Sequence, residues 1–280
     1  MTDEPLLRVA SFSLVFVAMA AWEWLAPRRP LRLRRAERWP HNLALLLVDV
    51  AAVRVLAPAA AIGVALAAEA NGWGLLNGLN LPPWAVLAIA ILFLDLAIYF
   101  QHVTFHAVPA LWRLHRVHHA DLELDVTSGT RFHPLEILIS TAVKCGAVAA
   151  IGAPAAAVLA FEVILNATSV FNHANVRMPE ALDRWLRRFV VTPDMHRVHH
   201  SIRYNETSSN FGFSSPWWDR LFGTYRAQPA AGHEGMVIGV DAFRSREDLR
   251  IDRLLSQPWR ETPGGYSINR RPERAPEAQG

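Results

Sequence analysis

The sequence predicts an all-α fold, a multi-span integral membrane bundle of helices that carries a cytoplasmic, histidine-rich helical cap. Hydrophobic residues make up 52% of the 280 residues and charged residues only 19%. This composition is more apolar than that of an ordinary soluble enzyme. The apolar residues gather in runs long enough to cross a bilayer. Most histidines gather at the ends of these runs, in short repeated spacings.

The first two apolar runs predict two membrane helices joined by a basic loop. Residues 7–25 are nearly all apolar, and a second run covers about residues 43–68. The second run carries Asp49 and Arg54, whose charges must face protein or water rather than lipid. The arginine block in loop 27–38 could bind nucleic acid or mark the cytoplasmic side of a membrane helix. The flanking apolar runs favour the membrane, so we expect a cytoplasmic loop and no nucleic-acid partner.

A third span is predicted over residues 84–105. The loop before it, 69–83, has no Lys or Arg and contains the turn signals Asn71-Gly72 and Pro82-Pro83. We therefore expect that loop on the far side of the membrane, with the third span returning the chain to the cytoplasm. Residues 1–106 form the predicted N-terminal unit of about three spans.

A helical hairpin and a cytoplasmic cap complete the predicted organisation. Residues 135–172 are too many for one span, and Gly152-Ala153-Pro154 divides them into two helices that enter and leave on one side. The histidine-rich segment 107–134 and the cap, 173–259, therefore both lie on the cytoplasmic side. The last stretch, 260–280, is rich in Pro, Arg, Glu and Gly, and we expect it to be disordered.

Nine of the 12 histidines have positions that predict a metal cluster. Residues three or four apart share one helix face, so an H-x-x-x-H motif can bind one metal. In an H-x-x-H-H motif, the adjacent pair diverges by about 100° and can serve different metals. Two such motifs that face each other could enclose two metals. The candidate ligands are His102, His106, His115, His118, His119, His196, His199 and His200, with His173 as a ninth.

The type of ligand alone does not select the metal. A basic, solvated face would explain one H-x-x-H-H motif, but not two of them together with an H-x-x-x-H motif at a membrane boundary. Neutral imidazole suits Fe, Zn, Cu or Ni. Cys145 is the only cysteine, so an intramolecular disulfide and a cysteine-based zinc or iron–sulfur site are excluded. The sequence has no dinucleotide-binding glycine motif, so we expect electrons from an external reductase, ferredoxin or cytochrome.

These motifs resemble those of the sterol desaturase and fatty acid hydroxylase superfamily of membrane non-haem di-iron oxygenases. The resemblance covers roughly residues 94–225. Besides the histidines, the matching stretches are Phe132-His133-Pro134-Leu135-Glu136, Asn205-Glu206-Thr207, Asn210-Phe211-Gly212 and Trp218-Asp219-Arg220-Leu221-Phe222-Gly223-Thr224-Tyr225. The resemblance implies two iron ions, with zinc possible in the isolated protein, O2 as co-substrate and a lipid substrate from the bilayer. Some fatty acid hydroxylases have two histidines near the position of His173, where this chain has one.

Several polar residues are candidates to support the ligands, because a metal-bound histidine usually donates its other N–H to a carboxylate or carbonyl. Asp95 lies two turns before His102; its alternative is a buried carboxylate paired with Arg54 or a polar helix contact. For Asp194 the alternative is an N-cap of its helix. His133 precedes a proline, so we expect it in extended chain and not on a metal-facing helix; it stays a candidate for supporting the site or binding metal. The other candidates are Asn166, Asn172, Asn175 and Asp219.

The predicted function is that of a membrane-bound oxygenase that hydroxylates or desaturates an unactivated C–H bond of a fatty acyl, sterol-like or other isoprenoid lipid. The same metal centre could instead cleave a lipid ether or aldehyde. A non-oxygenase metal-binding or transport protein is a third reading, but it predicts ligands along a path inside the spans. Trp217, Trp218 and Phe222 are expected to pack the cap onto the membrane helices or line the substrate site. His41 and His233 are expected at the surface or the membrane interface.

Overall fold

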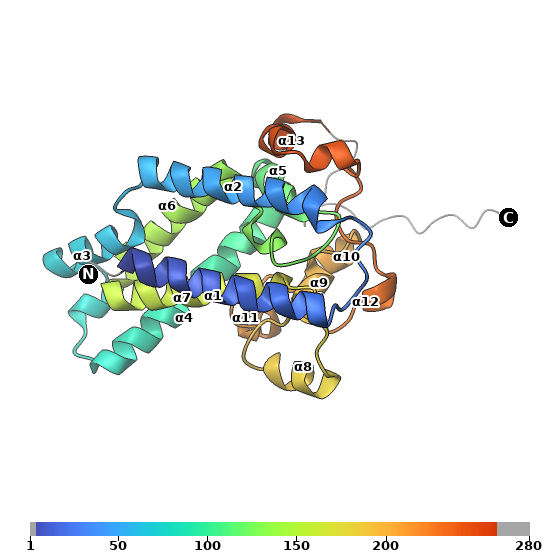
Figure 1. Ribbon diagram of the computed structural model, residues 1–280. Coiled ribbons are helices and arrows are strands. Elements are labelled where there is room, and N and C mark those ends of the chain that lie inside the picture. Colours follow the sequence, from blue (N-terminus) through green and yellow to red (C-terminus); the bar gives the residue numbers. More distant parts are fainter. Residues whose placement is uncertain (1–3, 262–280) are drawn as a thin grey trace.

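The computed structural model describes residues 4–261, and their regular structure is helical apart from two isolated β-bridges (Figure 1). The fold prediction of an all-α, multi-span bundle is confirmed. Residues 262–280, most of the stretch expected to be disordered, lie outside the described residues. The helical segments long and apolar enough to cross a membrane are Glu4–Leu25, Arg35–Gly78, Pro83–Ala107, Pro134–Ile151 and Ala155–His173.

A proline divides the second apolar run, which we expected to be continuous. It forms α2 (Arg35–Leu56) and α3 (Ala60–Asn71), on either side of Pro58. Proline lacks an N–H and its ring clashes with the preceding turn, so a helix does not continue through it easily. The first run forms α1 (Glu4–Leu25), and the 3₁₀ turn η1 (Leu75–Gly78) follows α3.

The helices α4 (Pro83–Ala107) and α5 (Pro109–His119) both begin with proline. Proline is favoured at this position because the N–H that it lacks would have no partner in the helix. Pro109 therefore ends one helix and starts the next, and α5 packs against α4. This turn places the histidines at the end of α4 beside those of α5.

The expected hairpin is formed by α6 (Pro134–Ile151) and α7 (Ala155–His173), with Gly152 at the turn in a left-handed conformation, φ 72°. A Cβ atom on Gly74 would lie 2.1 Å from the backbone nitrogen of Gly152, so side chains are excluded where the two loops meet. Both hairpin helices pack against α4, while α1 packs on α7 and α2 on α6.

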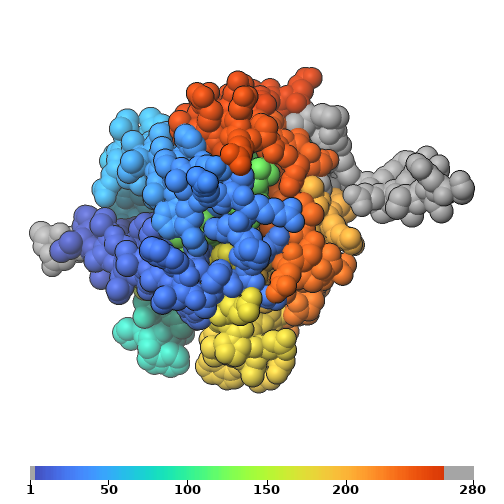
Figure 2. All heavy atoms as spheres, turned by 45° about the vertical axis from the view of Figure 1, so that its right-hand side comes forward, coloured from blue at the N-terminus to red at the C-terminus, as the bar shows by residue number. Residues whose placement is uncertain are grey.

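The cap gathers at the end of the bundle where α4 meets α5, as Figure 1 shows. In Figure 2 its orange and red C-terminal part lies directly beside the blue N-terminal helices. Trp218 donates a hydrogen bond of 2.9 Å to Asp95, and Phe222 stacks on Tyr99, so these aromatic residues pack the cap onto α4. The cap elements are α8 (Glu180–Leu186), α9 (Pro193–His199), α10 (Tyr204–Thr207), α11 (Trp217–Leu221), α12 (Gly232–Gly235), η3 (Arg246–Leu249), α13 (Ile251–Ser256) and η4 (Gln257–Trp259).

Candidate metal centre

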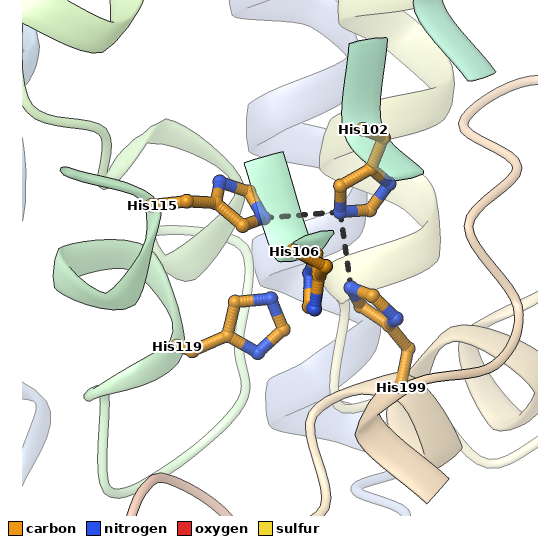
Figure 3. A group of neighbouring side chains, drawn as sticks. All are labelled: His102, His106, His115, His119 and His199. Carbon is orange, nitrogen blue, oxygen red and sulfur yellow. Dashed lines mark hydrogen bonds between the residues drawn. The ribbon is translucent and has the colours of Figure 1, made fainter. Parts of the chain in front are cut away.

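Nine histidines converge in two adjacent groups. The five-histidine group comprises His102 and His106 from α4, His115 and His119 from α5, and His199 from α9; Figure 3 shows their rings turned toward one another. The four-histidine group comprises His118, His173, His196 and His200. Within each group, one ligand atom from every residue lies within 4.8 Å of those of the others.

Each H-x-x-H-H motif contributes to both groups. The first and last histidines of a motif stay together, because residues four apart share a helix face. The middle histidine crosses over: His118 joins the four-histidine group and His199 joins the five-histidine group. The groups therefore lie side by side, with ring centroids 5.3 Å apart for His118 and His119. A pair of metal sites that share two short helices is the arrangement that this geometry favours.

Backbone carbonyl groups fix the orientation of three of the rings. The Nδ1 atom of each ring donates a hydrogen bond of 2.7 Å: His102 to Phe211, His199 to Ser209 and His173 to Ser169. A carbonyl oxygen can only accept, so Nδ1 carries the proton of the neutral ring. The Nε2 atom is left with a lone pair that faces the interior of the group.

The donor atoms fit a metal ion in each group. Nε2 of His102 lies 3.0 Å from Nε2 of His115 and 3.0 Å from Nε2 of His199, the contacts dashed in Figure 3. Lone pairs that face each other repel, so these contacts need a cation between them. Two imidazole nitrogens, each about 2.1 Å from a metal and at about a right angle, are about 3.0 Å apart. In the other group, Nε2 of His173 lies 3.1, 3.0 and 3.2 Å from those of His118, His196 and His200.

Burial keeps the imidazoles in the form that binds metal. All nine rings are buried. Removal from water disfavours the charged form, lowering the pKa of His115 to about 3. The same effect, followed by repulsion from neighbouring rings, holds the pKa of His119 and His200 well below the ordinary value. The rings are therefore neutral at pH 7, as metal coordination requires.

Glu136 supports a histidine and was missed by sequence reasoning. Its Oε1 accepts a hydrogen bond of 2.6 Å from Nδ1 of His115, and the carboxylate is buried. A carboxylate in this position fixes the ring and raises its basicity toward a metal. The residue belongs to a stretch that carried the family resemblance, but no spacing rule links it to a histidine on another helix.

Asp219, a predicted supporting residue, acts through the backbone. It accepts hydrogen bonds from the N–H groups of Phe211 at 2.8 Å and Gly212 at 2.9 Å. These bonds hold the segment whose Phe211 carbonyl orients His102. Burial raises the pKa of Asp219 to about 6, although its hydrogen bonds oppose the shift.

Comparison with known proteins finds a match over the segment that contains these site residues. The family model described as fatty acid hydroxylase matches residues 87–224, a segment that contains all nine histidines, Glu136 and Asp219. The chain belongs to the fatty acid hydroxylase superfamily. No solved structure matches it significantly.

Three curated relatives are similar to this chain over half of its length or more. Ornithine lipid hydroxylase OlsE of Rhizobium tropici is 29% identical over 51% of this chain and 42% of its own length. Alkylglycerol monooxygenase of Homo sapiens is 26% identical over 59% of this chain and 36% of its own length. Cholesterol 25-hydroxylase of Rattus norvegicus is 26% identical over 50% of this chain and 47% of its own length. The chain thus spans less than half the length of these relatives.

Asp95 and Asp194, which were predicted to support the metal ligands, lie outside both histidine groups. Asp95 accepts its hydrogen bond from Trp218 rather than pairing with Arg54. Asp194 forms ion pairs with Arg28 and Arg197. It is not the N-cap of α9, because Thr192 holds that position and accepts the N–H of Met195.

The remaining candidates also lie outside the two groups. Asn172 donates to the carbonyl of Phe213 and Asn175 to that of Arg29, while Asn166 is exposed to a cavity. His133 caps α6 by accepting the N–H of Leu135 and lies 3.1 Å from the carbonyl oxygen of Leu255. His233, which we expected at the surface, is buried 3.5 Å from Asp194.

A cavity of ≈ 540 Å³ adjoins the five-histidine group, where His102 and His115 form part of its wall. It extends between α1, α2, α4, α6 and α7. Its apolar wall includes Phe12, Val50, Ile98, Phe105, Leu165 and Phe213. A cavity of this size and lining suits part of a lipid molecule.

Proposed function

We propose that the protein is a membrane-bound oxygenase that hydroxylates or desaturates an unactivated C–H bond of a lipid. Two iron ions, one in each histidine group, would serve as the resident cofactor. The observation that carries the proposal is the convergence of neutral, buried imidazoles in two adjacent groups beside a lipid-sized cavity. The lipid hydroxylases and monooxygenases among its relatives support it.

Bound iron would supply the activation of O2 and the cleavage of the C–H bond. The chain's own residues hold the imidazoles in place: the Phe211, Ser209 and Ser169 carbonyls and Glu136 orient four rings. The cavity would position the lipid against the five-histidine group. Electrons would come from an external reductase, ferredoxin or cytochrome, as the sequence predicts.

We place the centre on the cytoplasmic side of the membrane. The arginine-rich loop after α1 lies at the cap end of the bundle, where its Arg28 pairs with Asp194. Basic loops stay in the cytoplasm, so the histidine groups at this end would do so too. Cleavage of a lipid ether is a second candidate, favoured by the similarity to alkylglycerol monooxygenase.

Metal analysis combined with oxygen uptake tests the proposal. The purified protein in detergent should bind about two iron ions per chain and consume O2 when a reductant and a lipid extract are supplied. Mass spectrometry should show lipids that gain one oxygen atom or lose two hydrogen atoms. Stable zinc binding without oxygen uptake under reducing conditions would exclude the oxygenase.

A further inference from the structure

Three buried acceptor oxygens line the cavity without a donor. They are Oδ1 of Asp49 on α2, Oε1 of Gln101 on α4 and Oε2 of Glu136 on α6, and none has a hydrogen-bond partner among residues 4–261. Asp49 and Glu136 are each only 4% exposed. Buried polar groups are normally paired, so acceptors from three helices that share one cavity indicate a missing donor.

These oxygens lie on the metal side of the cavity. Glu136 holds His115, and Gln101 precedes His102 in the chain. Asp49 lines the same cavity from α2, which packs against the α6 helix that carries Glu136. Among residues 4–261, neither carboxylate forms an ion pair with a lysine or arginine, so the two favour a ligand that brings N–H or O–H groups.

Farther from the histidines, the cavity wall also carries the cations Arg8, Arg54 and Lys144, and two of these are paired. Lys144 and Arg8 both pair with Glu162, and Arg8 also pairs with Glu4 at 2.8 Å. Lys144 lies about 12 Å beyond Glu136 along α6. The cavity-lining acceptors that are buried without a partner therefore lie near the histidines, where a bare hydrocarbon chain would leave them uncompensated.

We propose that the metal-side half of the cavity binds the polar head of the lipid substrate through its hydrogen-bond donors. The inference rests on the proposed function and deepens it: oxygen enters in or next to the head rather than far along an acyl chain. The tails remain among the exposed apolar side chains of α1 and α2, which border the cavity. One oxygen atom of O2 enters the C–H bond, and the other leaves as water with two protons and two electrons from the external donor.

Three phospholipids with identical acyl chains test the inference. Phosphatidylethanolamine offers N–H donors, phosphatidylglycerol offers O–H donors, and phosphatidylcholine offers neither in its head. With the iron-loaded full chain, we expect oxygen in the head fragment of a donor-bearing lipid and about tenfold less product from phosphatidylcholine. Equal oxidation of phosphatidylcholine, or oxygen only in acyl fragments, overturns the inference but leaves the oxygenase standing.

Binding of the same lipids to the zinc-loaded protein distinguishes failure of this inference from failure of the proposed oxygenase function. A preference of about tenfold for the donor-bearing lipids supports the inference even if no lipid is oxidised, in which case the proposed function fails. Equal binding of all three lipids overturns the inference.

Asp49→Asn should remove most of the preference for phosphatidylethanolamine, with metal content unchanged. The matched control is Glu69→Gln, an exposed carboxylate on α3 outside the cavity wall. If Asp49→Asn does not fold, Gln101→Leu tests the same preference. A variant that folds and keeps the full preference contradicts the inference.

Discussion

Glu136 and His115 are joined by a hydrogen bond of 2.6 Å between the carboxylate Oε1 and the imidazole Nδ1. The bond links the first turn of α6 to α5 and leaves Nε2 of His115 facing Nε2 of His102. The membrane hairpin therefore helps to fix a ring of the five-histidine group, so substitutions in the first turn of α6 should weaken metal binding by this group.

Glu136→Gln should weaken metal binding, because an amide is a weaker acceptor and does not raise the basicity of the imidazole. Loss of such a carboxylate typically costs about 10- to 100-fold in metal affinity. Competition with a chelator measures the change, and Glu69→Gln is the control. Unchanged affinity would contradict a contribution of the Glu136 carboxylate to metal binding.

His118→Ala and His199→Ala should each deplete the histidine group that does not contain the other two histidines of the same motif. His118→Ala should deplete the four-histidine group and His199→Ala the five-histidine group, because the middle histidines cross over. Each variant should retain about one metal per chain and lose lipid oxidation while still inserting into membranes. Metal analysis of membrane-extracted protein checks the result, and full turnover by either variant would refute the assignment.

Gly129→Ala should disturb the four-histidine group. A Cβ atom at Gly129 would lie 2.8 Å from the Ser169 carbonyl oxygen and 3.2 Å from Nδ1 of His173. The added methyl group would disturb the hydrogen bond between Nδ1 of His173 and the Ser169 carbonyl oxygen, so metal content should fall. Gly78→Ala is the matched control, since nothing lies within 4 Å of its Cβ position. Equal metal content in both variants would contradict the expectation.

Arg38→Met should destabilise the whole bundle. Arg38 is fully buried and pairs with Asp121 at 2.7 Å and Asp125 at 2.5 Å, tying α2 to the loop after α5. Its removal leaves two buried carboxylates with less compensation, at a cost of about 3–5 kcal/mol. Thermal unfolding in detergent measures this loss. Arg246→Met breaks the exposed pair with Glu37 and should cost about 1 kcal/mol or less.

The same network predicts a dependence of stability on pH. Burial alone would raise the pKa of Asp121, but ion pairs with Arg38 and Arg131 outweigh it and hold the pKa well below 3.8. The folded state therefore binds fewer protons than the unfolded state. This stabilisation is present above pH 3.8 and is lost as the pH falls toward the lower folded-state pKa. Unfolding midpoints across this range should fall less steeply in Arg38→Met than in the unaltered protein.

Local patterns in the sequence predicted the helices and the histidine set. Apolar runs of membrane length predicted the spans, and Gly152 and Pro154 predicted the hairpin turn. The histidine spacings selected the nine residues that converge. The break at Pro58 was missed because the apolar run continues on both sides of it, although proline is unfavourable in the interior of a helix.

The amino-acid sequence by itself determined the all-α membrane bundle and which histidines meet, because helix periodicity and apolar length act over short stretches of chain. Tertiary structure alone decided how histidines from different helices combine into two groups. Helix spacing separates His118 from His119, but the grouping of His118 with His173 depends on how α5 and α7 pack. Tertiary structure also decided that Glu136, rather than Asp95, contacts a histidine, since a hydrogen bond between two helices depends on their relative placement.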